Sequence, residues 1–179
     1  MVSDDDRLLE MAKAAYERSR GLFALRVAAP VALLPMVSFL LGTSARSATL
    51  LGAGLVVSIG LVMWRGGPFA WGGFSGLKAG AIPLVLAHAA KLVGHVCTPA
   101  GCTTLCVPAC ATGGIAAGLL IEWFARQGPS PNVTRVLGVT VAVFTGGLGC
   151  ACVGSSGLLA MVVGLGASLV GGRLVPARA

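Results

Sequence analysis

The chain has 179 residues, of which 56% are hydrophobic and only 11% are charged, and its mean hydropathy is +0.90. This composition excludes a soluble globular domain and is typical of an integral membrane protein. The net charge of +7 does not indicate direct nucleic-acid binding, because the basic residues are scattered singly between apolar runs. The sequence contains no phosphate loop, serine triad or dinucleotide fingerprint, so we expect no conventional enzyme activity.

Residues 1–22 are predicted to form a cytoplasmic helical arm. Ser3 followed by three aspartates is a favourable helix start, because acids stabilise the positive end of the helix dipole. Apolar residues then recur at helical spacing while charged residues occupy the other side, so the arm is amphipathic. Such a helix suits either a membrane surface or a protein partner. The residues predicted to contact a protein partner are Leu8, Leu9, Ala12 and Tyr16.

Residues 23–172 are predicted to form an all-α polytopic bundle of about six transmembrane helices. The first apolar run is too long, and is preceded by too many acids, for a cleavable signal peptide. Pro30 and Pro35 predict a kink within it, because proline lacks a backbone N–H. The expected spans are residues 23–41, 48–63, 79–96, 110–124, 136–153 and 158–172.

The distribution of lysine and arginine predicts the orientation of the bundle. With a cytoplasmic amino terminus, eleven of the 13 basic residues lie inside, Arg46 lies outside and Lys91 lies within a span. Cytoplasmic loops carry such an excess of positive charge. We therefore expect both termini in the cytoplasm, a short cytoplasmic tail at residues 173–179, and a location in the bacterial inner membrane surrounded by lipid.

Small residues recur at intervals of four in, or directly before, three of the later spans. Such faces let membrane helices approach closely. We expect them to pack helices within one subunit, with homo-oligomer formation as the alternative use. The residues concerned are Gly76, Gly80, Gly114, Gly118, Gly164, Ser168 and Gly172.

A polar seam leads along the third span into a cysteine-rich outer loop. His88, Lys91 and His95 fall at i, i+3 and i+7, so a continuous helix would place all three on one face. In the predicted topology every cysteine lies at or near the outer surface. These candidate site residues are Cys97, Cys102, Cys106, Cys110, Cys150 and Cys152.

Two kinds of site fit the cysteines. In an oxidising compartment, disulfides would join the third loop to the outer end of the fifth span. Alternatively, the thiolates and the imidazole of His95 would bind a soft metal ion such as zinc or copper, although the spacing matches no standard zinc motif. No predicted outer loop, and no outer half of a span, contains a carboxylate that could pair with Lys91. Lys91 therefore either snorkels to the surface or keeps nearby thiols reactive. At the inner side, Glu122 and Arg126 are predicted to form an ion pair.

An arm that enters a six-span bundle directly, with AAYERSR before the first span and a cysteine-bearing outer loop, resembles the polytopic anti-sigma factors of bacteria. In that family the amino-terminal segment holds a sigma factor at the membrane until a signal releases it. The resemblance implies a membrane regulator with a cytoplasmic sigma-factor partner and no enzymatic activity. Two alternatives stay open: a thiol-dependent transporter of metal or small solutes, which needs a polar path through the spans, and a membrane thiol oxidoreductase, which needs a quinone or partner-thiol site.

Overall fold

The computed structural model describes residues 4–41, 43–93, 95–98, 101–151 and 154–174. Six helical segments are long and apolar enough to cross a membrane, which confirms the predicted helical, multi-pass architecture. The elements are α1 (Asp4–Val31), α2 (Leu33–Leu40), α3 (Ala45–Arg65), α4 (Gly67–Val93), β1 (His95–Thr98), β2 (Gly101–Thr104), α5 (Cys106–Gln127), α6 (Pro131–Cys150) and α7 (Ser155–Leu174).

The first span is broken where the prolines predict a kink. Helix α1 ends at Val31 and α2 begins at Leu33, and together they make one membrane segment. Pro35 has no N–H to bond the carbonyl four residues earlier, which is that of Val31, so the helical ladder is interrupted at this point. Pro35 also lies against the backbone of Gly52 in α3, where a larger residue would overlap its ring.

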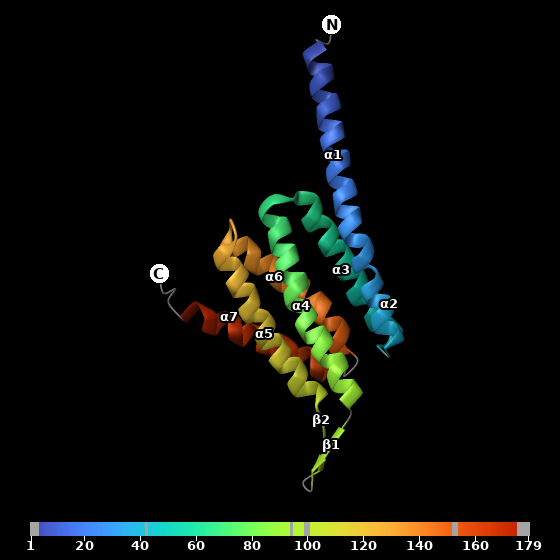
Figure 1. The fold of residues 1–179 in the computed structure, drawn as a ribbon, viewed down its shortest axis with the longest axis vertical. Coiled ribbons are helices and arrows are strands. Elements are labelled where there is room, and N and C mark those ends of the chain that lie inside the picture. Colours follow the sequence, from blue (N-terminus) through green and yellow to red (C-terminus); the bar gives the residue numbers. More distant parts are fainter. Residues whose placement is uncertain (1–3, 42, 94, 99–100, 152–153, 175–179) are drawn as a thin grey trace.

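The arm and the hairpin project from opposite ends of the molecule (Figure 1). The amino-terminal part of α1 extends beyond the other helices, and Ala24 is the first buried residue of this helix within the described chain. The turns between α3 and α4 and between α5 and α6 lie toward the arm end, whereas β1 and β2 lie beyond the opposite ends of α4 and α5. The spans therefore alternate in direction as a multi-pass bundle requires.

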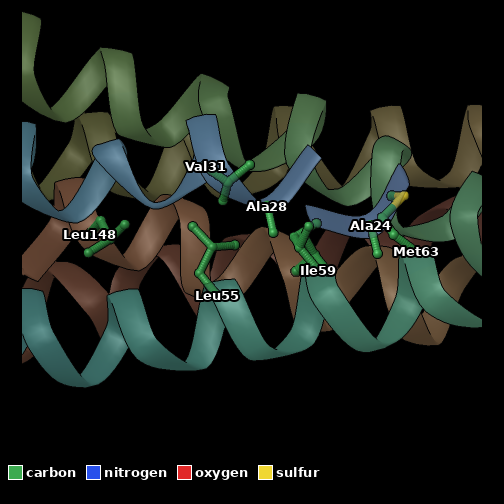
Figure 2. Packing of buried hydrophobic residues seen from close by; sticks show 8 residues of the cluster. Ala24, Ala28, Val31, Leu55, Ile59, Met63 and Leu148 are labelled. Carbon is green, nitrogen blue, oxygen red and sulfur yellow. The ribbon is translucent and has the colours of Figure 1, made fainter. Parts of the chain in front are cut away.

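One hydrophobic core joins α1 to α3 and α6. Ala24, Ala28 and Val31 of α1 face Leu55, Ile59 and Met63 of α3, with Val141 and Leu148 of α6 completing the cluster (Figure 2). The alanines keep α1 close to its neighbours, and the larger aliphatic side chains fill the space between them. This core connects the root of the arm to the far end of α6.

Glycines determine how α4 packs on α6. A Cβ atom at Gly76 would lie 2.5 Å from the carbonyl oxygen of Gly138, and one at Gly80 would lie 2.9 Å from Cα of Ala142. Real Cβ atoms do not approach backbone so closely, so only glycine allows this spacing. Gly72 contacts α6 one turn nearer the arm end, and the two helices therefore run parallel along a shared small-residue face.

Helices α5 and α7 also pack closely through glycines. A Cβ at Gly114 would overlap the carbonyl oxygen of Met161, and one at Gly164 would overlap that of Ala111. Gly118 packs on Ser168, and Gly172 packs on the side chain of Glu122. These contacts, and those of Gly76 and Gly80 with α6, confirm that the small residues pack helices within one subunit.

The third span begins much earlier than the sequence predicts. Helix α4 starts at Gly67 instead of residue 79, because its glycine-rich first half packs on α6 despite the low helix propensity of glycine. Lys78 consequently lies inside α4 and not in a cytoplasmic loop. Its ammonium nitrogen is 5.4 Å from the ring centroid of Phe124, which lies toward the arm end of α5.

The cysteine-rich loop that the sequence predicts after the third span contains a β-hairpin. Strands β1 and β2 are antiparallel, with His95 opposite Thr104 and Cys97 opposite Cys102. Helix α4 ends at Val93, before the hairpin begins, so the third span does not reach residue 96. The hairpin carries two of the candidate site cysteines beyond the ends of α4 and α5.

Candidate functional site

Two cysteines meet inside the bundle near its hairpin end. Cys110 lies in the second turn of α5 and Cys150 is the last residue of α6, and their side chains share a hydrogen bond. Both residues are 0% exposed. Ala87 of α4 and Met161 of α7 pack against the pair, so it lies where four helices converge. Neither thiol is in a disulfide in this structure.

Glycines one turn from each cysteine bring the pair together. Gly114 follows Cys110 by one turn and contacts the backbone of α7, and Gly146 precedes Cys150 by one turn and contacts Pro83 and Met161. Gly149 lets α6 approach the backbone of Leu84. These glycines therefore let α5 pack closely on α7, and α6 on α4 and α7, at the level of the two cysteines.

The remaining cysteines are only partly gathered around this pair. Cys106 lies one turn before Cys110 on α5 and is half-buried. Cys97 and Cys102 are opposite each other in the register of the hairpin, and their side chains lie outside the described part of the structure. Cys152 lies outside the described residues. The structure therefore shows two cysteine pairs at one end of the molecule, one in the bundle and one in the hairpin.

The predicted metal site is not formed by the side chains that the structure describes. Within them, no three His, Cys, Asp or Glu residues lie together as a metal ion would require. His95 is in β1, where its backbone pairs with that of Thr104, and its side chain is outside the described part. Metal binding by these residues stays a prediction.

The predicted polar seam is wrong in its last member. A helix that continued from His88 through Lys91 would bring His95 to the same face, but α4 ends at Val93 and His95 belongs to a strand. Turn-forming residues after the helix, including Pro99 and Gly101, favour the hairpin over further helix. His88 and Lys91 do share a helical face one turn apart.

Among the described residues, the hydrogen-bond partner of Lys91 is a backbone carbonyl. Its ammonium group donates a hydrogen bond to the carbonyl oxygen of Leu41, at the end of α2. The side chain is exposed at the hairpin end of α4. This position fits the prediction that Lys91 snorkels along the helix toward the surface.

A buried charge cluster at the arm end of α5 was only partly predicted. The Glu122 carboxylate is 4.0 Å from Nε of Arg126, which confirms the predicted pair. A closer partner is Arg135 of α6, whose Nε and Nη2 donate hydrogen bonds of 2.8 and 2.7 Å to the two carboxylate oxygens. Helical spacing identifies partners within one helix, and Arg135 approaches across the turn between α5 and α6, which spacing does not reveal.

The charge cluster also joins α7. Nη2 of Arg126 donates a hydrogen bond of 2.9 Å to the carbonyl oxygen of Gly172 near the end of that helix. The charge cluster therefore links α5, α6 and α7 around Glu122, in the half of the bundle that lies opposite the buried cysteines.

The residues predicted to bind a partner are all exposed on the arm. Leu9 is 69% exposed and Tyr16 is 62% exposed, and Leu8 and Ala12 are exposed beside them. The guanidinium of Arg20 lies 5.4 Å from the ring centroid of Tyr16, near the point where α1 meets the bundle. The arm thus presents an apolar stripe that nothing in the described chain covers.

Comparison with known proteins gives no relative for this chain. No family model, no curated protein and no solved structure matches it.

Proposed function

We propose that this protein is a membrane regulator that holds a cytoplasmic protein, of the sigma-factor class, on its amino-terminal arm. The observation that carries the proposal is the shape of α1, which continues without interruption from Asp4 to Val31. A helix that lies on the membrane surface must bend where it enters the bilayer. The amino-terminal part of this continuous helix instead projects beyond the other helices (Figure 1). Leu9 and Tyr16 belong to it and are exposed, so another protein can bind them.

The position of the buried cysteine pair supports a further part of the proposal, that the regulator responds to a chemical change of these thiols at the end of the bundle opposite the arm. Leu148, which precedes Cys150 by two residues, packs in the core that contains Ala28 and Val31 of α1. Thr43, between α2 and α3, donates a hydrogen bond of 3.3 Å to the carbonyl oxygen of Leu148. A change at the thiols that displaced the end of α6 would therefore act on the helix that bears the arm.

The proposal requires the arm in the cytoplasm and the hairpin outside, as the distribution of basic residues predicts. Topology reporters fused after Arg20, Gly101 and Arg178 test this arrangement. Cytoplasmic activity is expected after Arg20 and Arg178, and exported activity after Gly101. Exported activity at either terminal position would contradict both the orientation and the sigma-factor partner.

Photo-crosslinking tests the partner. A photoreactive residue in place of Ala12 in the full-length protein in cells should crosslink to a sigma factor, and the purified membrane protein should inhibit transcription directed by that factor. Leu9→Asn with Tyr16→Asn should reduce both effects by about tenfold or more, because interface aromatic and aliphatic anchors dominate binding energy. The matched control, Lys13→Asn with Glu17→Asn, changes the charged face without altering net charge and should retain both effects.

Crosslinking to lipid alone would contradict the proposal and favour a surface helix. Equal inhibition of transcription by the apolar-face variant and the wild type would also contradict it. Binding of a different class of cytoplasmic protein would retain the regulator and reject the sigma factor.

A membrane thiol oxidoreductase is the second candidate, and the two cysteine pairs at one end favour it. Such an enzyme would oxidise a partner dithiol to a disulfide while one of its own disulfides is reduced to a dithiol, and a quinone would then accept the two electrons and reform its disulfide. Catalytic oxidation of a dithiol peptide with added quinone as the electron acceptor, lost in Cys110→Ala, would support it. A regulator should show at most one stoichiometric exchange.

A further inference from the structure

A groove between α2 and α4 contains a buried imidazole nitrogen that no described protein group satisfies. Nδ1 of His88 lies 2.8 Å from the carbonyl oxygen of Leu84. Because a carbonyl only accepts hydrogen bonds, Nδ1 must carry the proton, and Nε2 of the neutral ring then has a free lone pair. Nε2 is buried and has no hydrogen-bond partner within the described structure. It requires a donor from outside the chain.

The groove itself is aliphatic and has a volume of about 340 Å³. Leu34 and Val37 of α2 line one side, and Leu84 and Val85 of α4 line the other. His88 lies toward the hairpin end of this surface, since α4 runs from the arm end to the hairpin end. An occupant must therefore be apolar along most of its length and polar near His88.

A cation stands at the hairpin end of the groove. Lys91 is one helical turn beyond His88, and its ammonium group bonds the carbonyl of Leu41, which also lines the groove. An ammonium has three donors, so one such bond leaves further capacity for an anion.

The chain supplies no acid for this cation. Five of its acids are in the arm, and the sixth, Glu122, lies toward the opposite end of the bundle and is engaged by Arg135. A carboxylate beside Lys91 must come from a ligand.

We propose that the groove binds a long-chain fatty acid, with its carboxyl group at His88 and Lys91 and its alkyl chain along α2 and α4. A carboxylic acid satisfies both polar residues at once, because it can give its proton to Nε2 of His88 and so leave a carboxylate that accepts hydrogen bonds from the imidazole and from the ammonium of Lys91. The ester and phosphodiester groups of a phosphatidylcholine or phosphatidylglycerol have no donor adjoining the acyl chain for Nε2. A fatty alcohol has the donor but no charge to complement Lys91.

The position of the two residues agrees with this orientation. His88 and Lys91 lie within the last two turns of α4, which ends at Val93. The head group would therefore lie near the membrane surface while the alkyl chain extends toward the bilayer centre. The binding does not depend on the partner of the arm.

A photoreactive fatty acid with a diazirine in its alkyl chain tests the site in full-length protein reconstituted in phosphatidylcholine nanodiscs. We expect labelling concentrated on groove residues of α2 and α4, and competition by oleic acid but not by an equal amount of phosphatidylglycerol. His88→Phe should lower labelling by about tenfold, because it removes a hydrogen bond to the acid. The matched control, His95→Phe, changes the other histidine and should label as the wild type does.

A second variant protects the test against misfolding of His88→Phe. Val85→Trp fills the groove, retains His88, and should also prevent labelling. In ¹⁵N NMR of the wild type without fatty acid, Nε2 of His88 should have the chemical shift of an unprotonated imidazole nitrogen, and oleic acid should change that chemical shift. Even labelling of all lipid-facing helices, normal labelling of Val85→Trp, or an unchanged Nε2 signal would overturn the proposal. Equal competition by phosphatidylglycerol would overturn the fatty acid in favour of an anionic phospholipid.

Discussion

The guanidinium of Arg135 on α6 donates hydrogen bonds to both carboxylate oxygens of Glu122 on α5, at 2.8 and 2.7 Å. The Glu122 side chain is only 5% exposed and that of Arg135 is 22% exposed. A bidentate pair fixes the relative orientation of its two helices as well as their separation. This contact joins α5 to α6 across the turn between them, and Gly172 of α7 packs against the side chain of the same glutamate.

Removing one partner of this pair should destabilise the bundle. Arg135→Met leaves the buried carboxylate without its closest partner, and we expect a loss of about 3 kcal/mol in the free energy of unfolding in detergent. Arg126→Met is the control, because Arg126 is 41% exposed, its contact with Glu122 is 4.0 Å long, and its hydrogen bond to the carbonyl oxygen of Gly172 is made at an exposed site. Its cost should stay below about 1 kcal/mol. Equal effects of the two changes would show that Arg135 does not dominate the cluster.

The glycine contacts make a second stability prediction. Gly114→Ala would place a Cβ 3.0 Å from the carbonyl carbon of Met161 and closer still to its oxygen, and backbone cannot yield as a flexible side chain does. We expect α5 and α7 to separate, with a loss of about 1–3 kcal/mol in unfolding free energy. The measurement is thermal unfolding of purified protein in the same detergent.

Gly166→Ala on α7 is the matched control for that change. A Cβ at Gly166 meets nothing within 4 Å, so the substitution should be neutral or stabilise the helix by up to about 1 kcal/mol. A loss as large as that for Gly114→Ala would mean that helix flexibility, and not close packing, explains the glycines.

The sequence predicts the membrane helices well because each is a long apolar run, and apolar length is what a bilayer selects. It misplaces the start of α4 because Gly72, Gly73 and Gly76 oppose helix formation locally while packing within the bundle stabilises it. Only the facing helix reveals this second effect. The spacing of four between small residues nevertheless predicts the packing faces correctly.

The candidate site is predicted less completely than the fold. Sequence identifies Cys110 and Cys150 as residues of one end of the bundle, but their pairing depends on how α5 and α6 approach. His95 is misplaced because helical periodicity was extended past Val93, where the chain turns into a hairpin. Arg135 is missed because its partner is on another helix.

The buried cysteine pair should behave as one unit. Cys110→Ala and Cys150→Ala each remove the shared hydrogen bond and leave space beside Met161. We expect the double variant to lose less unfolding free energy than the sum of the two single variants, with a coupling of about 0.5–1.5 kcal/mol. Cys106→Ala combined with Cys150→Ala is the control and should be additive, since Cys106 is not part of the cluster that contains Cys150. Additivity of the buried pair would show that the two thiols only occupy space.

The register of the hairpin predicts a disulfide between Cys97 and Cys102. The two residues are directly opposite in an antiparallel ladder, where Cα atoms are about 4.5–5.5 Å apart. A disulfide joins Cα atoms at about 4.4–6.8 Å, so the backbone can accept the bond without rearrangement. Mass spectrometry of unreduced protein from membranes should therefore find Cys97 bonded to Cys102, in preference to the bond from this loop to Cys150 or Cys152 that the sequence alone favours. Cys102→Ser with Thr103→Cys places the second thiol opposite Val96 and should lower the yield of the bond at least about tenfold, because a one-residue shift moves the side chain to the other face of the hairpin. If Cys97 instead bonds to Cys150 in the wild type, or if the shifted cysteine bonds as readily, the hairpin register does not determine the pairing.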